Sequence, residues 1–182
     1  KYIKPTLYGE MIWCQGYSEP NAGSDLASLQ TKAELIDGEW VINGQKIWTS
    51  TAQYAHMMFC LVRTEPDASK HAGISYLLIP MDTPGIEIRP LVDMTLKAGF
   101  NEVFFTDVKI PETNIVGNRG EGWAVANATL GHERGSLAPP DAIMSRLNML
   151  LELMQQETLD GKPLSDDSIL SLIHISEPTR PC

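Results

Sequence analysis

The sequence lacks the features that mark several large classes of protein. Its three cysteines, Cys14, Cys60 and Cys182, are far apart and form no Cys-x-x-Cys pair, so neither a metal site nor a disulfide framework is predicted. We expect Cys14 and Cys60 to be buried free thiols. No apolar run approaches the ~20 residues that a membrane-spanning helix needs, and the sequence has no internal repeat or low-complexity stretch.

Basic residues are also in the minority. The 182 residues include 14 Lys and Arg against 23 Asp and Glu, a formal net charge of -9. This charge repels a phosphate backbone and no Lys/Arg cluster offsets it, so nucleic acid is not an expected partner. The first residues, KYIKPTLYGE, lack the basic-then-apolar layout of a secretory signal. We therefore expect a cytoplasmic protein in a bacterium, or a mitochondrial-matrix protein in a eukaryote.

The first two thirds of the chain have the pattern of an all-β unit. Short β-branched and aromatic runs alternate with turn residues between Met11 and Pro111. Asp37-Gly38 predicts a hairpin with a primed turn, because both residues tolerate the positive φ that such turns require. Asn43-Gly44 predicts a second turn of the same kind. Further strands are predicted at residues 56–63, 73–80, 85–91 and 102–110.

The last third of the chain has helical spacing. Ala, Leu and Val recur at helical intervals from Gly120, and Pro139-Pro140 must break or kink the predicted helix because neither proline donates a backbone N–H. Asp141 helps to restart a helix with one apolar face. That face comprises Ile143, Leu147, Leu150, Leu151 and Met154. A domain boundary is predicted at residues 116–122.

The end of the chain differs from the rest. Residues 170–180 read LSLIHISEPTR, which resembles the translation of a transposon-type sequencing adapter. We therefore expect residues 170–182 to be derived from an adapter and not from the natural protein. The alternative is a genuine tail that ends in proline. No role is assigned to residues of this segment such as His174.

The segment Gln15–Asp25, QGYSEPNAGSD, is the strongest candidate for a binding site. It supplies hydroxyls, small residues and backbone N–H groups in one loop, as an edge-on flavin or a pyrophosphate requires. By composition alone the segment is also typical of a surface turn with Asp25 as a cap. Glu19, next to Pro20, is expected to be a structural carboxylate and not a catalytic base.

Four motifs, in the same order, resemble those of the acyl-CoA dehydrogenase family. They are SEPNAGSD at 18–25, VINGQKIWTS at 41–50, DTPGI at 82–86 and VFFTDVKIP at 103–111, and the likeness covers roughly residues 11–135. The resemblance implies an α+β fold with a β-barrel-like middle domain flanked by truncated α-helical domains. The end of the N-terminal helical domain is expected at residues 1–10, the middle domain at 11–115, and the start of the C-terminal helical domain at 119–169.

The resemblance also implies FAD as the cofactor and identifies the residues that contact it. The cofactor-binding residues carried over from the motifs are Gln15, Tyr17, Ser18, Gly23, Ser24, Trp48, Thr49 and Ser50. Trp48 would pack against the isoalloxazine, Ser50 would replace a threonine that hydrogen-bonds the flavin N5 edge, and Ser24 would also lie near the thioester. Serine keeps the hydroxyl of threonine and loses a methyl group. The alternatives are a half-buried strand aromatic at Trp48 and a turn serine at Ser50.

The catalytic base implied by the resemblance is Glu133. The reaction needs a carboxylate that removes a weakly acidic proton, and burial beside an acyl chain raises a carboxyl pKa toward the working range. The isovaleryl and long-chain members carry this Glu in an L-x-x-E-R segment, and this chain has Leu130-Gly131-His132-Glu133-Arg134. Arg134 would contact the CoA moiety of the substrate. The alternative is a Glu-Arg pair on a solvated helix face.

The resemblance implies an oxidoreductase of fatty-acid β-oxidation in the full-length protein. It would remove a proton from Cα of an acyl-CoA and pass a hydride from Cβ to FAD. Electron-transfer flavoprotein is the expected electron acceptor, and a homotetramer is the expected assembly. The 182-residue piece is expected to be inactive. The alternatives are a flavin monooxygenase or nitroalkane-oxidase-like protein on the same scaffold, and a non-catalytic binding relative.

Overall fold

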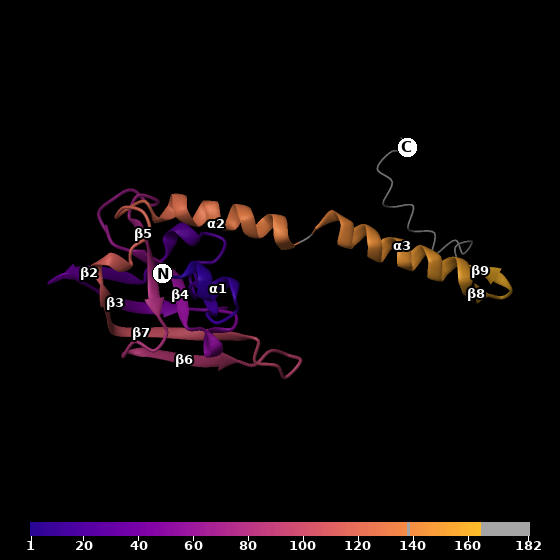
Figure 1. Ribbon diagram of the computed structural model, residues 1–182, viewed down its shortest axis with the longest axis horizontal. Coiled ribbons are helices and arrows are strands. Elements are labelled where there is room, and N and C mark those ends of the chain that lie inside the picture. Colours follow the sequence, from indigo (N-terminus) through magenta and orange to yellow (C-terminus); the bar gives the residue numbers. More distant parts are fainter. Residues whose placement is uncertain (138, 165–182) are drawn as a thin grey trace. The chain divides into compact units, whose positions relative to one another are not determined.

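The computed structural model describes residues 1–137 and 139–164 (Figure 1). The chain divides into two compact units, Lys1–Leu130 and Gly131–Cys182, which we call the sheet unit and the helical unit. The predicted adapter segment 170–182 lies outside the described residues, and the predicted domain limits stay predictions. Within the described part of the chain, no helix is long and apolar enough to cross a membrane.

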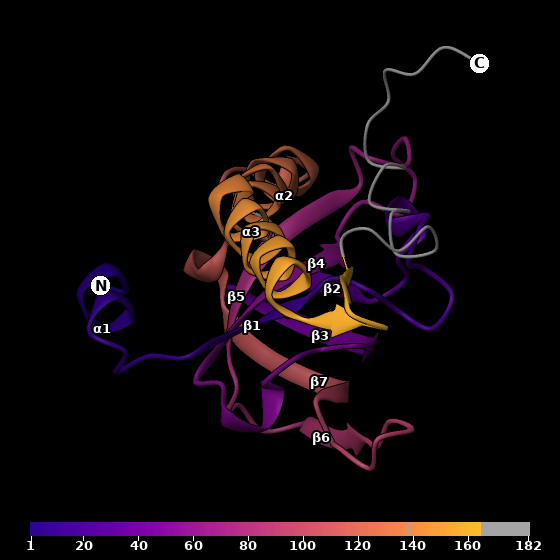
Figure 2. The ribbon, with the colours of Figure 1, turned by 90° about the vertical axis from the view of Figure 1, so that its right-hand side faces the viewer.

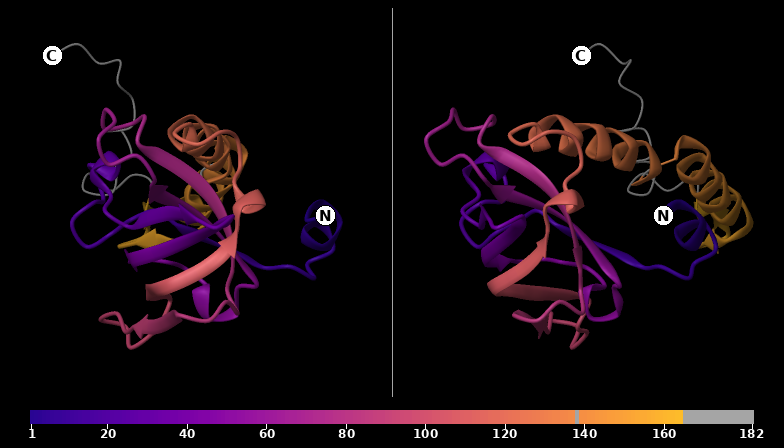
Figure 3. Two further views of the ribbon diagram at one scale, coloured as in Figure 1. Left: turned by 90° about the vertical axis from the view of Figure 1, so that its left-hand side faces the viewer. Right: turned by 60° about the vertical axis from the view of Figure 1, so that its left-hand side comes forward.

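The sheet unit is built on one mixed sheet. Its seven strands are β1 (Trp13–Gly16), β2 (Lys32–Ile36), β3 (Glu39–Lys46), β4 (Met57–Arg63), β5 (Ile74–Pro80), β6 (Ile86–Leu91) and β7 (Phe100–Pro111). Their order is β1-β4-β2-β3-β7-β6, with β5 also paired to β4. β4 pairs in parallel with β1 and β2, and the other pairs are antiparallel. The sheet curls into a half-barrel (Figures 2 and 3), which confirms the predicted fold class.

The two predicted turns have different outcomes. Asp37 (φ 51°) and Gly38 (φ 81°) connect β2 to β3 as a primed turn, so the first prediction is confirmed. The second is wrong, because Asn43 and Gly44 lie inside β3 at a β-bulge, where the register with β7 shifts between Ile42 and Gly44. Gly44 has φ 151°, and a Cβ there would lie 2.6 Å from Thr31 Cα, so the bulge requires glycine.

The core of the sheet unit consists of two clusters of buried side chains. One contains Cys14, Trp40, Ile42 and Cys60, and the other joins Tyr17, Leu29 and Tyr76 to Ala126 of α2 (Gly122–Leu137). Cys14 and Cys60 are buried free thiols, as predicted. Burial raises the pKa of Cys14 to about 12 and that of Cys60 to about 11, so neither thiol acts as a nucleophile at neutral pH.

The remaining elements are helices and short turns. The sheet unit also contains α1 (Ile3–Leu7) and the 3-10 turns η1 (Leu26–Ser28), η2 (Ala52–Tyr54) and η3 (Glu112–Asn114), and the helical unit contains α3 (Pro140–Gln156), β8 (Thr158–Leu159) and β9 (Lys162–Pro163). Pro139 caps α3 and Pro140 lies in its first turn, so the predicted break is confirmed. On the predicted apolar face of α3, Met154 is buried, Leu147 and Leu151 are half-buried, and Ile143 and Leu150 are exposed.

Gly122, where α2 begins, is a site at which a single methyl group should be costly. A Cβ at this position would lie 2.6 Å from Tyr76 N and 2.7 Å from Ser75 Cα in β5. Because both atoms belong to a paired strand, Gly122→Ala in the full-length protein should cost about 1–3 kcal/mol of stability, as overpacking does. Hydrogen exchange of the β5 amides measures this loss of stability. Gly99→Ala is the control, since no heavy atom lies within 4 Å of a Cβ at that position, and an equal loss in both variants would contradict the explanation.

Candidate functional site

The two candidate segments, residues 15–25 and 46–50, lie side by side. The N–H of Ile47 donates to the carbonyl of Ser18 at 2.9 Å, and Lys46 Nζ donates to the carbonyl of Tyr17 at 3.2 Å. β1 delivers the first segment from the edge of the sheet, and β3 ends at the second. The fold therefore makes one continuous surface from stretches that are far apart in the sequence.

A buried ion pair joins these segments at their centre. Glu19 Oε1 lies 2.8 Å from Lys46 Nζ, and their side chains are 6% and 0% exposed. The Glu19 carboxylate also accepts hydrogen bonds from the N–H groups of Gln30 (2.6 Å) and Thr31 (3.0 Å). Burial by itself raises the pKa of Glu19, but the charge of Lys46 and the hydrogen bonds together hold this pKa below its usual value. Glu19 thus has the surroundings of a structural carboxylate.

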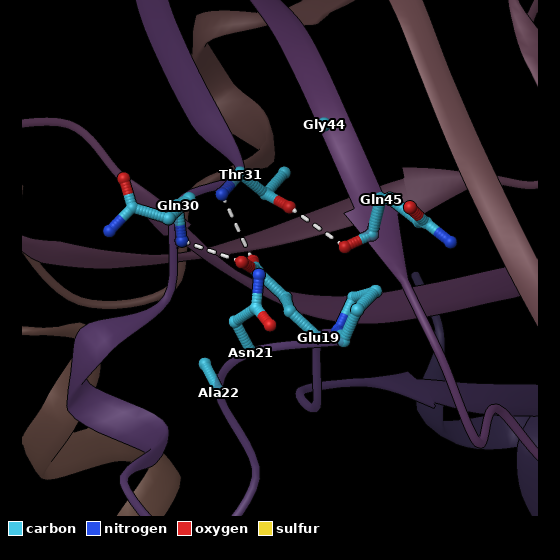
Figure 4. Close-up of a pocket in the computed structure, with 8 residues that line it drawn as sticks. Glu19, Asn21, Ala22, Gln30, Thr31, Gly44 and Gln45 are labelled. Atoms are coloured by element: carbon cyan, nitrogen blue, oxygen red, sulfur yellow. Dashed lines mark hydrogen bonds between the residues drawn. The ribbon is translucent and has the colours of Figure 1, made fainter.

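A pocket of about 270 Å³ opens beside this ion pair (Figure 4). It is lined by Glu19, Pro20, Asn21, Ala22, Gln30, Thr31, Gly44 and Gln45. The Glu19 carboxylate points toward the N–H groups of Gln30 and Thr31, and the Thr31 hydroxyl donates to the carbonyl of Gln45 at 3.2 Å. Because the charged lining group is already paired, we assign this pocket no chemistry.

The Trp48 ring is displayed on the surface of the sheet unit. It is 60% exposed, and its edge-to-face contact with Phe100 has a centroid distance of 5.9 Å. Trp48 has φ 60°, in the left-handed region that aromatic residues rarely adopt. Ser50 is exposed as well, whereas Thr49 is buried. The segment therefore presents an aromatic ring and a hydroxyl to solvent and turns Thr49 inward.

The predicted residues of the first segment fall into two groups. Gly23 and Ser24 are exposed, and Gln15 and Ser18 are half-buried. Tyr17 is buried, with its hydroxyl 3.2 Å from that of Tyr76. Tyr17 and Thr49 therefore turn their side chains inward, whereas Ser24, Trp48 and Ser50 can offer side chains to a surface ligand.

Glu133 and Arg134 lie in the second half of α2, which belongs to the helical unit. Glu133 is half-buried, and Arg134 is exposed in the last turn of the helix. The contacts between Gln15–Ser18 and residues 46–50 belong to the sheet unit, so each unit contributes its own predicted residues. No cluster of three or more His, Cys, Asp or Glu suited to a metal ion occurs among the residues that the structure describes.

Two buried residues that contact the candidate segments are absent from the sequence prediction. Lys46 could have been found from its position, because a lysine in an otherwise apolar strand needs a buried carboxylate partner. Asn101, which is 0% exposed in β7, lies next to Thr49 through paired backbone hydrogen bonds. Its only sequence signal is an amide side chain at the start of a β-branched and aromatic run.

A family model and curated relatives of this chain name the same family. A family model described as "Acyl-CoA dehydrogenase, middle domain" matches residues 14–108. The chain is 51% identical over 155 residues to acyl-CoA dehydrogenase IpdE1 of Mycobacterium tuberculosis, which covers 84% of this chain and 40% of that protein. It is 48% identical over 160 residues to acyl-CoA dehydrogenase FadE34 of the same organism, covering 88% and 22%.

A solved structure is similar over nearly the whole chain. The ChsE4-ChsE5 complex from Mycobacterium tuberculosis matches with a TM-score of 0.80 and 34% identity, over 96% of this chain and 46% of that one. The chain therefore spans less than half the length of these relatives.

Proposed function

The chain belongs to the acyl-CoA dehydrogenase family, and from this we propose that the full-length protein is an oxidoreductase that uses FAD to introduce an α,β-double bond into an acyl-CoA. The proposal is supported above all by the direct contact between residues 15–19 and 46–47. This contact joins the backbone next to Trp48 to the start of the loop that carries Ser24. FAD, when bound, supplies the acceptor for the hydride that leaves Cβ.

The exposed groups of the sheet unit fit a flavin. The Trp48 indole is a flat aromatic surface that a ring system can cover. The hydroxyls of Ser24 and Ser50 are exposed and can donate to or accept from polar edges of the cofactor. Gly23 has no heavy atom within 4 Å of a Cβ position, so the loop leaves room for a phosphate to approach its backbone. We assign ring contact to Trp48 and the polar contacts to the loop and to Ser50.

We assign the removal of the Cα proton to Glu133. Of the two side chains in the Leu130–Arg134 segment that can accept a proton, the carboxylate of Glu133 is half-buried and the imidazole of His132 is exposed. His132, its neighbour, is exposed and is not assigned a role. Arg134 carries a guanidinium on the same stretch of α2 and is assigned to the CoA portion of the substrate.

Truncating the Trp48 ring tests the proposed cofactor site. In the full-length protein, Trp48→Ala should raise the dissociation constant of FAD roughly 10- to 100-fold, since an aromatic contact and its buried area are worth roughly 1.5–3 kcal/mol. Trp48→Phe should have a smaller effect. Titrating the apoprotein with FAD and following the flavin fluorescence gives both constants.

The matched control for this test is Ile36→Ala. Ile36 is 49% exposed and pairs with Glu39 at the hairpin end of β3, whereas Trp48 follows the other end of that strand. FAD binding should be unchanged in this variant. A wild-type protein that binds FAD no more tightly than Trp48→Ala would refute the cofactor site.

The electron acceptor and the assembly are also proposals. We propose electron-transfer flavoprotein as the acceptor, in which case the reduced enzyme reacts slowly with oxygen. Rapid reoxidation by oxygen with release of hydrogen peroxide would instead favour the monooxygenase or nitroalkane-oxidase-like alternative. The assembly is a homotetramer or, as the name of the ChsE4-ChsE5 complex suggests for that relative, a complex of two different chains. Sedimentation of the full-length protein expressed alone distinguishes these assemblies.

A further inference from the structure

The backbone around Trp48 is held in an unfavourable conformation. Trp48 has φ 60° and Thr51 has φ 59°. The left-handed region is disfavoured for every residue with a Cβ, and a β-branched residue such as Thr51 is a clear outlier there. Two such residues within four positions persist only where the surroundings fix them. Some nearby group must therefore hold the Trp48–Thr51 segment in place.

Asn101 makes the contacts that can do this. Its backbone N–H donates to the carbonyl of Thr49 at 3.0 Å, and the N–H of Thr49 donates to the carbonyl of Asn101 at 3.0 Å. Its side-chain Nδ2 donates to the same Thr49 carbonyl at 2.9 Å and to Gln53 Oε1 at 2.6 Å. These bonds fix the chain on both sides of Thr51. One strand residue thus links Thr49, inside the strained segment, to Gln53, two residues beyond its end.

Residues at and just before the start of β7 complete the arrangement. Phe100, directly before Asn101, meets the Trp48 ring edge to face at 5.9 Å. Gln53 in turn donates through Nε2 to the carbonyl of Ala98 at 3.5 Å. The start of β7 therefore supports both the backbone and the ring of the Trp48 segment.

The buried environment of Asn101 argues against a role in packing alone. The residue is 0% exposed, and its Oδ1 and the nearby Thr49 Oγ1 are buried without a protein partner among the described residues. Burying polar atoms without full hydrogen bonding opposes folding. An apolar residue would fill an inward-facing strand position at lower cost, but it could not bridge Thr49 to Gln53.

We propose that Asn101 is a positioning residue for the cofactor site: its side chain clamps the Trp48–Thr51 segment to β7 and so holds the Trp48 ring where it can meet the flavin. This inference rests on the proposed function for its cofactor part. Its structural part, that Asn101 controls the orientation of Trp48, is independent of FAD. The two parts can be tested separately in the same variants.

The test uses the full-length protein and three variants. Asn101→Ala removes both side-chain hydrogen bonds, to Thr49 and to Gln53, and keeps the two backbone bonds to Thr49. Gln53→Ala removes its second anchor at an exposed residue, where folding is not at risk. The control is Asn114→Ala, because Asn114 Nδ2 also donates to a backbone carbonyl, that of Leu78 at 2.9 Å, but on a different part of the sheet unit.

The first readout is the near-ultraviolet circular dichroism of the apoprotein. The band due to Trp48 is defined by difference from Trp48→Phe. This band should be lost in Asn101→Ala, reduced in Gln53→Ala and retained in Asn114→Ala, because only the first two release the strained segment. A retained Trp48 band in both Asn101→Ala and Gln53→Ala would overturn the proposal, whether or not the protein binds FAD.

The second readout is the bound cofactor. Loss of two hydrogen bonds should raise the FAD dissociation constant about tenfold in Asn101→Ala, with a shift of the flavin midpoint potential. In Asn114→Ala the FAD dissociation constant should change less than about twofold and the midpoint potential should not shift, since Asn114 lies outside the clamp. If Asn101→Ala and Asn114→Ala lose thermal stability equally, and the FAD affinity and flavin midpoint potential of both stay unchanged, Asn101 is merely structural. If wild type itself does not bind FAD, the proposed function fails and the dichroism alone decides the clamp.

Discussion

Replacing Glu133 by Gln in the full-length protein should slow the reduction of bound flavin by acyl-CoA about 10²- to 10⁴-fold, the range that a positioned general base contributes. The amide has nearly the shape of the carboxylate but cannot accept the Cα proton, so binding should change much less than the rate. Anaerobic stopped-flow measurement of flavin bleaching after mixing with acyl-CoA gives the rate directly. Binding of the acyl-CoA is followed from the shift of the flavin spectrum.

The control for this prediction is Glu152→Gln. Glu152 is an exposed carboxylate on α3, and its replacement should leave the bleaching rate within about twofold, as surface changes remote from a site usually do. Undiminished bleaching in Glu133→Gln would show that another carboxylate is the base. A wild-type protein that binds FAD and acyl-CoA without bleaching would instead support the non-catalytic alternative.

The two Gly-containing pairs show how far local sequence determines this fold. Asp37-Gly38 and Asn43-Gly44 carry the same turn signal. The first is a turn because β2 pairs back onto β3, with Ile36 opposite Glu39. The second remains within a strand because β7 runs along β3 on both sides of it, from Pro111 to Val103. Pairing with the distant strand β7 makes this segment a bulge and not a turn. The residues around Asn43 give no indication of this pairing.

The candidate site shows a similar limit at the level of single side chains. The order of the motifs indicates which segments belong together, and Ser18 does contact Ile47. It does not indicate which side chains face outward. Lys46 and Trp48 are two residues apart and would share a face in a regular strand, yet Lys46 is fully buried and Trp48 is 60% exposed. The left-handed φ of Trp48 breaks the alternation, and it depends on contacts with β7 that lie about fifty residues away.

The ion pair between Lys46 and Glu19 gives the second large expected effect. Lys46→Met in the full-length protein should destabilise the sheet unit by about 3–5 kcal/mol, because it leaves the Glu19 charge buried without its partner. Hydrogen exchange of the β3 and β4 amides measures this loss. Lys32→Met is the matched control: its pair with Glu34 is 3.6 Å long, with side chains 55% and 60% exposed, and should be worth about 0–1 kcal/mol.

The pH dependence of the same variant separates loss of charge from loss of packing. In the wild type the pKa of Glu19 is held below its usual value of 4.5, so the stability due to its ionised form is complete above that value and is lost as pH falls through the folded-state pKa. Without Lys46 the burial that opposes ionisation prevails, and the pKa of Glu19 rises. The stability difference between Lys46→Met and wild type should therefore shrink as the pH is lowered from 7 to about 4.

A double variant that neutralises both Lys46 and Glu19 tests the same ion pair. Glu19→Gln added to Lys46→Met removes the unpaired charge, and the single amide oxygen can still accept from one of the two N–H groups, those of Gln30 and Thr31, that bond to separate carboxylate oxygens in the wild type, so part of the lost stability should return. FAD affinity should recover less than stability, because Lys46 Nζ also holds the carbonyl of Tyr17 against β3. If Lys46→Met is no more damaging than Lys32→Met at pH 7, the ion pair does not hold the two segments together, and the cofactor surface must owe its shape to the Ile47–Ser18 hydrogen bond and the Asn101 clamp.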